Sequence, residues 1–281
     1  MGRIRNTIEL AKTSWGVLQK DRELVLLPVL SFIITLLVLA VFVVPGLLAT
    51  DFDAVDSTTG EQAPAIPAFS YILFALGGAG AAIVSVFFTG ALVAGAHERM
   101  SGGDPTVGSA IGRAVQRIPG LVPWALLTFT VGMVIRALRE RAGWLANLLL
   151  GGIEMAFEIA AFLTIPAIVI DEKGAIDGFK TSASLLRTTW GENLAARVGF
   201  GLLGFVAVIP AVIVGALALA SGVTTVIVLG IAIAAVWIAV VFATISALGG
   251  IFQAALYMYA TSGTAPEGFE QANLGDTFSR K

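Results

Sequence analysis

The chain has 281 residues, of which 57% are hydrophobic and 13% are charged, about half the charged fraction of an ordinary soluble domain. Its mean hydropathy of +0.91 excludes a water-soluble globular domain, because so few polar groups cannot cover the surface of one. The net charge of -2 argues against nucleic-acid binding, and the lack of cysteine excludes disulfides and thiolate metal sites.

Apolar stretches of membrane-spanning length recur along the whole chain. A span needs about 20 apolar residues to cross about 30 Å of hydrocarbon. Such stretches lie at 24–49, 68–96, 120–135, 145–170, 198–220 and 224–258. The first is longer than the apolar region of a secretory signal peptide, so we expect it to be retained. The predicted fold class is therefore all-α, a polytopic membrane helix bundle with six transmembrane helices.

Three of these spans have features that affect where the membrane-spanning helix begins or ends. The third is short, and it extends past Arg136 if that side chain snorkels to the membrane interface. In the fourth, Gly151 and Gly152 weaken the helix, which predicts an interfacial turn before the span proper. The sixth, at about 35 residues, is too long for one untilted span.

Three amphipathic surface helices are predicted, one before each odd-numbered span. The first has apolar residues at helical spacing, namely Ile4, Ile8, Ala11, Trp15 and Leu18. The second covers 105–118, with Asp104 as its N-cap and Pro105 in its first position; its apolar stripe is Val107, Ile111, Ala114 and Ile118. The third covers 175–196 and aligns Ile176, Phe179, Ala183, Leu186, Trp190 and Leu194.

Most of the 17 basic residues fall on the side of the membrane that holds the N-terminus in a six-span topology. The first loop on the other side, 50–67, has no basic residue. The positive-inside rule therefore places both termini in the cytoplasm of a cell-membrane protein. Arg136, Arg139 and Arg141 are exceptions, and a five-span topology would move them. We predict one integral membrane domain at 1–260 and a cytoplasmic tail at 261–281.

Several short phrases carry a resemblance to a known family. They are Asp171-Glu172-Lys173-Gly174, Phe179-Lys180-Thr181-Ser182, Trp190-Gly191-Glu192, the run from Phe252 to Thr261, and Arg22-Glu23-Leu24 with Pro28. These phrases resemble a family of prokaryotic multi-pass membrane proteins of unknown function. The chain is also distantly similar to the membrane domain attached to some glycerophosphodiester phosphodiesterases, whose catalytic domain is absent here. The resemblance implies a fold and no activity.

Glu154 and Glu158 are the only acidic residues inside the predicted spans, and they share one helix face at i and i+4. A carboxylate in hydrocarbon is costly, so both are expected to face the bundle interior or a hydrated cavity. Two interpretations remain open. Glu154 forms a structural ion pair with Arg136, Arg139 or Arg141, or the two carboxylates form a proton or cation site.

Two groups of residues point to partners. Cations on the surface helices are candidate contacts for anionic lipid, namely Lys12, Lys20, Arg113, Arg117, Lys180 and Arg187. The small-residue runs 77–82 and 90–96, with pairs such as Gly78 and Ala82, predict close helix packing. That packing lies within one chain, or between chains of a homo-oligomer or with another membrane protein.

No catalytic, cofactor or nucleotide motif is present. His97 is the only histidine, and its sole local acidic neighbours are Glu98 and Asp104, too few for a metal site. Ser182 and Ser184 lack a histidine near them in sequence. We therefore expect no catalytic, cofactor or metal site, and a structural or accessory membrane component. A small transporter or channel-like bundle is the alternative, and a membrane-embedded enzyme a second one.

Overall fold

The computed structural model describes residues 2–54, 64–190, 200–270 and 274. Within these residues the regular structure is helical, and the only extended pairing is an isolated antiparallel bridge between Asp51 and Ala65. The predicted all-α fold class is confirmed.

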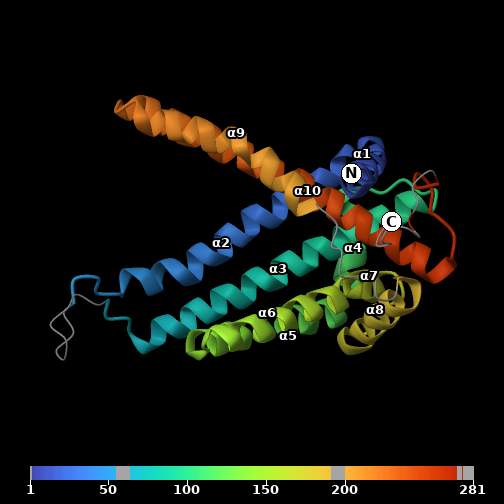
Figure 1. Cartoon of the computed structure of the whole chain (residues 1–281), viewed down its shortest axis with the longest axis horizontal. Coiled ribbons are helices and arrows are strands. Elements are labelled where there is room, and N and C mark those ends of the chain that lie inside the picture. The colour runs from blue at the N-terminus through green and yellow to red at the C-terminus, as the bar shows by residue number, and fades with distance from the viewer. Residues whose placement is uncertain (1, 55–63, 191–199, 271–273, 275–281) are drawn as a thin grey trace.

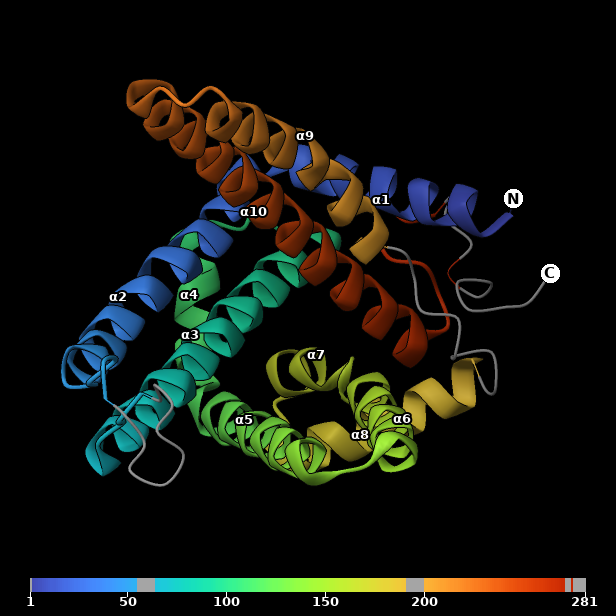
Figure 2. The ribbon, with the colours of Figure 1, turned by 60° about the vertical axis from the view of Figure 1, so that its left-hand side comes forward.

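Long helices pair into hairpins along the chain. The elements are α1 (Gly2–Lys20), η1 (Arg22–Val25), α2 (Leu26–Leu48), α3 (Ala68–Met100), α4 (Val107–Gln116), α5 (Ile118–Arg141), α6 (Trp144–Ala161), α7 (Thr164–Val169), α8 (Ala175–Trp190), α9 (Phe200–Ala220) and α10 (Thr224–Ser262). α2 packs with α3, α5 with α6 and α9 with α10 (Figure 2). The shorter helices α1, α4 and α8 come before these three hairpins in the chain.

Five segments are long and apolar enough to cross a membrane, namely Arg22–Leu48, Ala68–Met100, Ile118–Arg141, Trp144–Val169 and Thr224–Ser262. They correspond to five of the six predicted spans. The remaining one, 198–220, corresponds to α9, in which a shorter stretch, Ala207–Ala220, counts as an apolar helix. The chain is thus a membrane-type helical bundle, and the count of six spans stays a prediction.

Two helices are longer than a bilayer's apolar core is thick. α3 has 33 residues and α10 has 39, which at about 1.5 Å per residue gives about 50 Å and 58 Å against about 30 Å of hydrocarbon. Most of their buried residues fall in Phe88–Met100 and Ala243–Tyr257. We call these two stretches, with α1, η1, α4, α7 and α8, the base. We call α2, α5, α6, α9 and the first halves of α3 and α10 the outer half.

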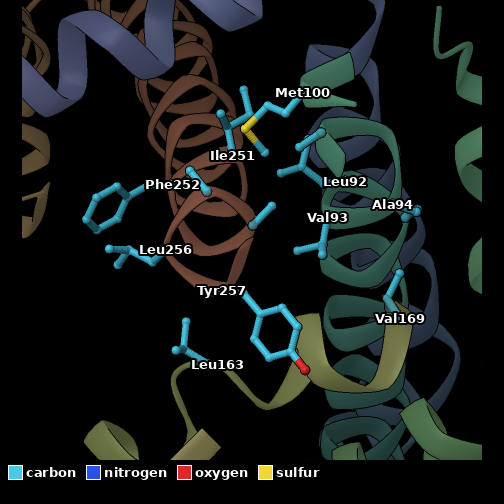
Figure 3. Packing of buried hydrophobic residues seen from close by; sticks show 14 of the residues in the cluster. Leu92, Val93, Ala94, Met100, Leu163, Val169, Ile251, Phe252, Leu256 and Tyr257 are labelled. Carbon is cyan, nitrogen blue, oxygen red and sulfur yellow. The ribbon is translucent and has the colours of Figure 1, made fainter. Parts of the chain in front are cut away.

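The hydrophobic core lies in the base, where α10 crosses α3 next to α7 (Figure 3). The side chains that meet there include Leu92, Val93, Leu163, Val169, Ile251, Phe252, Leu256 and Tyr257. Gly250 permits the crossing, because an added Cβ would lie 2.4 Å from Cδ2 of Leu92. α1 and the end of α10 belong to this same end of the molecule (Figure 1).

The small-residue run of α3 packs inside the chain, as one of the two predicted alternatives has it. A Cβ added to Gly78 would lie 2.7 Å from the ring of Phe129 in α5. A Cβ added to Gly80 would lie 2.7 Å from Cγ1 of Val38 in α2. Close approach of helix backbones is how apolar helices associate in lipid, where burial of apolar surface offers little driving force.

The surface helices bury part of their predicted apolar stripes, such as Leu18, Ala114 and Leu186, together with small residues. In α1 the fully buried side chains are Ser14, Val17 and Leu18, whereas Trp15 is 43% exposed. In α8 the buried positions are Ala175, Gly178, Ser182 and Leu186, whereas Ile176 is 59% exposed. Small residues occupy the buried face of α8 because they let it approach α7 closely. A Cβ on Gly178 would lie only 3.1 Å from Ile168.

The predicted start of the second surface helix is wrong by two residues. Thr106, not Asp104, is the N-cap of α4, and it forms a reciprocal capping box with Ser109, with both N–H to hydroxyl distances 3.0 Å. Asp104 instead accepts from Arg99. α4 ends at Gln116, and residues 118 onward belong to α5. The predicted third surface helix, 175–196, is helical over 175–190, and its remainder lies outside the described residues.

The fourth span is interrupted later than its glycines predict. α6 runs without a break through Gly151 and Gly152, and the interruption falls between Ala161 and Thr164. Pro166 follows two residues after that break, where its missing N–H and its ring disfavour a continuous helix. The third span does extend past Arg136, since α5 continues to Arg141.

The segment after α10 packs back on α1. Gly263 ends α10 in the left-handed conformation at φ 72°, as a helix C-cap glycine does. Phe269 and Leu274 are fully buried in the same cluster as Val17 of α1. The predicted tail 261–281 therefore contributes to the base over its described residues.

Candidate functional site

Ion pairs in the base join helices that are distant in sequence. Arg99, at the end of α3, pairs through two nitrogens with Asp21, which lies between α1 and η1. Its Nη2 also donates to Oδ1 of Asp104 at 2.7 Å. The Asp21 side chain is only 6% exposed, and a carboxylate buried without such a partner is costly.

A second ion pair attaches α4 to α3. Arg113 lies with Nη2 3.4 Å from Oε2 of Glu98, and the Ser109 hydroxyl donates to the same oxygen at 3.4 Å. Ala110 and Ala114 are fully buried on the adjoining face of α4. The short helix is therefore held by its alanine face and by one carboxylate of α3.

The loop between α7 and α8 connects three helices. Its charged residues bond to different elements: Asp171 accepts from the Tyr257 hydroxyl of α10 at 2.6 Å, Glu172 pairs with Arg117 before α5, and Lys173 donates to Oγ1 of Thr181 in α8 at 3.0 Å. Nζ of Lys173 also lies 3.4 Å from Oδ2 of Asp171. The sequence phrase that carries the family resemblance is thus a junction of the base.

Backbone strain accompanies this junction. Glu172 has φ 59°, and it is the one non-glycine residue with positive φ among those that the structure describes. A non-glycine residue in this region is disfavoured by on the order of 1 kcal/mol. The ion pair with Arg117 holds the side chain in place and offsets this strain. The arrangement fixes geometry rather than exposing a reactive group.

His97 is partly buried beside charged groups of three elements. Its imidazole ring interacts electrostatically with three charged groups, namely the guanidinium of Arg113 in α4, the carboxylate of Asp171 in the α7–α8 loop and the carboxylate of Glu98 in α3. Its Nδ1 is buried without a hydrogen-bond partner. Across the described residues, no group of three His, Asp or Glu side chains is placed to hold a metal ion.

Ser182 has a structural bond. The side chain is fully buried in α8, and its hydroxyl accepts the N–H of Leu163 at 2.9 Å. This bond satisfies a backbone donor at the break between α6 and α7, where helical bonding is interrupted. Ser184, by contrast, is exposed on the same helix.

Of the two carboxylates in the fourth span, Glu154 forms an ion pair. Its partner is Nη2 of Arg139, one of the three candidates from sequence, and the two side chains are a little over one-third exposed. This guanidinium lies beside Gly151, where an added Cβ would be in ordinary contact with Nη2 at 3.5 Å. Glu158 is exposed on α6, a helix in which no residue is buried.

The six candidate lipid-contacting cations divide into two groups. Four of them pair with carboxylates: Lys20 with Glu267, Arg113 with Glu98, Arg117 with Glu172 and Lys180 with Asp177. Lys12 and Arg187 are exposed, and no ion pair joins either to a described residue. Lys20, Arg113 and Arg117 therefore join separate segments of the base, whereas the pair of Lys180 lies within α8 and is more than 70% exposed.

Sequence reasoning missed two contacts of the base, that of Asp21 with Arg99 and that of Asp171 with Tyr257. Asp21 and Arg99 are 78 residues apart, and Asp171 and Tyr257 are 86 apart. The sequence feature that could have indicated these residues is that charged and hydroxyl-bearing side chains lie directly beside apolar runs, at the ends of the predicted spans. Which of these groups pair depends on how the helices cross.

Comparison with known proteins gives a family without an activity. The model of a family described as a family of unknown function (DUF6159) matches residues 70–268. That range includes the α7–α8 junction and both carboxylates of α6. No curated protein and no solved structure matches the chain. The more distant similarity to the membrane domain attached to some glycerophosphodiester phosphodiesterases therefore remains an expectation from the sequence.

Proposed function

The chain belongs to the DUF6159 family of unknown function, and on this premise we propose that it is a non-enzymatic structural or accessory component of the cell membrane. In this proposal six helices span the membrane, and the base with both termini lies on the cytoplasmic side. Its partners are membrane lipids, with a second copy or another membrane protein as further candidates, and no nucleic acid.

The ion pair between Glu154 and Arg139 carries the proposal. A proton or ion pathway needs carboxylates that exchange their charge partner with the transported ion. Glu154 already has a cationic partner on the neighbouring helix, supplied within one hairpin. This pair stabilises the hairpin, and neither Glu154 nor Arg139 needs a transported ion to balance its charge.

The distribution of other polar groups supports the same conclusion. The ion pairs of the base link the turn after α1 to α3, α4 to α3, and the residue between α4 and α5 to the α7–α8 loop. In the outer half, large exposed residues are apolar, for example Leu37, Val41, Leu217 and Val236. Ion pairs in the base and an apolar surface on the outer half are more typical of a structural membrane protein than of a channel or transporter.

One observation favours a transporter or channel-like bundle as a second candidate function. Glu154 and Glu158 lie on α6, and no residue of that helix is buried. A shift of this helix would separate Glu154 from Arg139 and let both carboxylates meet a proton or cation.

Flux through proteoliposomes separates the two functions. Purified protein is reconstituted in vesicles with an entrapped pH-sensitive dye, and proton and cation leak is followed after an imposed gradient. We expect the leak of empty vesicles for the native protein and for Glu158→Gln. Leak above that level, abolished by Glu158→Gln or Glu154→Gln but kept by Glu140→Gln at the exposed end of α5, would establish the transporter instead.

A further inference from the structure

One face of α1 is exposed over the part of the helix whose side chains the structure describes. Lys12, Trp15 and Gln19 follow one another at i, i+3 and i+7, the spacing of a single helix face, and all three are exposed. Trp15 is 43% exposed although tryptophan is the largest apolar side chain of the helix. In the sequence, the same stripe continues through Ala11 to Ile8 and Ile4.

The rotation of α1 is fixed from its other side. Ser14, Val17 and Leu18 are buried against the base. The segment after α10 covers this side: a Cβ on Gly268 would lie 3.0 Å from Val17, and Phe269 is fully buried. Nζ of Lys20 lies 3.2 Å from Oε1 of Glu267. α1 therefore cannot turn Trp15 inward without breaking these contacts.

The exposed face of α1 carries a cation, Lys12, and the helix ends next to a candidate membrane-spanning segment. Lys12 is exposed, as is Arg22 in the turn that leads into α2, and no ion pair joins either of them to a described residue. Four residues after Arg22, α2 begins with Leu26, which is 52% exposed. The end of α1 is thus held at the boundary where apolar surface begins.

Taken together, an aromatic anchor and flanking unpaired cations at a membrane boundary match the chemistry of a lipid headgroup layer. Tryptophan prefers this layer because one end of its ring system is apolar and the other is polar. Ammonium and guanidinium groups beside it reach phosphate oxygens while their stems cover apolar surface. Buried small residues on the opposite face leave this side of the helix to the lipid.

We infer that the outward face of α1, formed by Lys12, Trp15 and Gln19 with Arg22 beside it, binds the headgroups of anionic phospholipids. This inference deepens the proposed function, because it names anionic phospholipid as the partner of the base. It rests on the proposed function only for the assignment of the base to the cytoplasmic side of the membrane. Lys20, Arg113, Arg117 and Lys180, which pair with carboxylates, are not part of the surface.

The cysteine-free chain permits a direct test. Gln19→Cys places one fluorescent label on the proposed surface of the full-length protein, which is reconstituted in vesicles of phosphatidylcholine and phosphatidylglycerol. Quenching is measured with bromine atoms carried either by the neutral or by the anionic lipid, at equal mole fraction. We expect stronger quenching by the anionic brominated lipid.

The matched variants decide which cations are responsible. Each cation at an anionic surface contributes a factor of about five in binding, so Lys12→Gln with Arg22→Gln should reduce the preference severalfold. Arg113→Gln, which removes one charge from a paired cation of the base, should leave it unchanged. A label that neither lipid quenches, equal quenching by the two lipids, or an equal loss in Arg113→Gln would overturn the inference. Proton flux does not enter this readout, so its outcome is separate from that of the proposed function.

Discussion

The base and the outer half of the molecule are built from similar helices that are held in different ways. In the base, residues of α3, α7 and α10 such as Ala91, Ala167 and Ile251 are completely buried, and charged side chains pair across elements. In the outer half, α6 has no buried residue, and α10 exposes Ile233 and Val236 by more than 60%. The same chain therefore uses two modes of packing.

Solvent accounts for this difference. In the proposed placement of the base at the membrane surface, apolar side chains left uncovered there would meet headgroups and water, so their burial would contribute about 25 cal/mol per Å². Around the outer half, lipid tails are as apolar as the side chains, so burying apolar surface between helices contributes little free energy to their association. Close packing at small residues contributes more. Substitutions in the two regions should follow these separate rules.

The largest contrast is expected from truncating one aliphatic or aromatic side chain in each region. Phe252→Ala, in the base, should lower the free energy of unfolding by about 3 to 5 kcal/mol because it leaves a cavity in the core. Val236→Ala, on the exposed face of the same helix, should change it by less than about 0.5 kcal/mol. Thermal unfolding in matched lipid nanodiscs measures both, and similar losses would contradict the division into two regions.

A buried charge of the base gives the next effect. Arg99→Leu should destabilise the protein by about 3 kcal/mol, because Asp21 would remain in the interior without a cation. Arg113→Leu is the matched control: its side chain is 48% exposed and its contact with Glu98 is longer, at 3.4 Å, so we expect about 1 kcal/mol or less. Chemical denaturation in the same nanodiscs compares the two. Equal losses would show that burial does not set the strength of these pairs.

In the outer half, an enlarged small residue should have the smallest of these effects. Gly78→Leu should destabilise by about 1 to 3 kcal/mol, since the new side chain collides with the ring of Phe129. Gly132→Leu adds the same side chain to α5 where a Cβ meets no atom within 4 Å. We expect it to be neutral or slightly stabilising, because leucine favours the helix. If both variants lose stability equally, helix fit is not what holds the outer half.

A further difference within the base concerns the polarity of its surface helices. Local pattern predicts one apolar stripe on each of α1 and α8. The structure divides each stripe: it buries Leu18 and Leu186 beside Ser14 and Ser182, and it exposes Trp15 and Ile176. Hydrophobic periodicity reports that a helix has an apolar side, but it does not distinguish a side that meets protein from a side that meets lipid.

The sequence by itself determined the fold class, the places of five membrane-type helices and the position of the surface helices between them. Long charge-free runs leave the backbone no alternative to helix in hydrocarbon, so this information is local. The alternative partners of Glu154 were also readable, because α5 and α6 are consecutive helices. Only the tertiary structure decided that Arg99 meets Asp21, that Asp171 meets Tyr257, and that the chain after α10 covers α1. These contacts depend on the crossing of α3 and α10, which local spacing does not encode because it is set by how small residues such as Gly250 let distant helices approach.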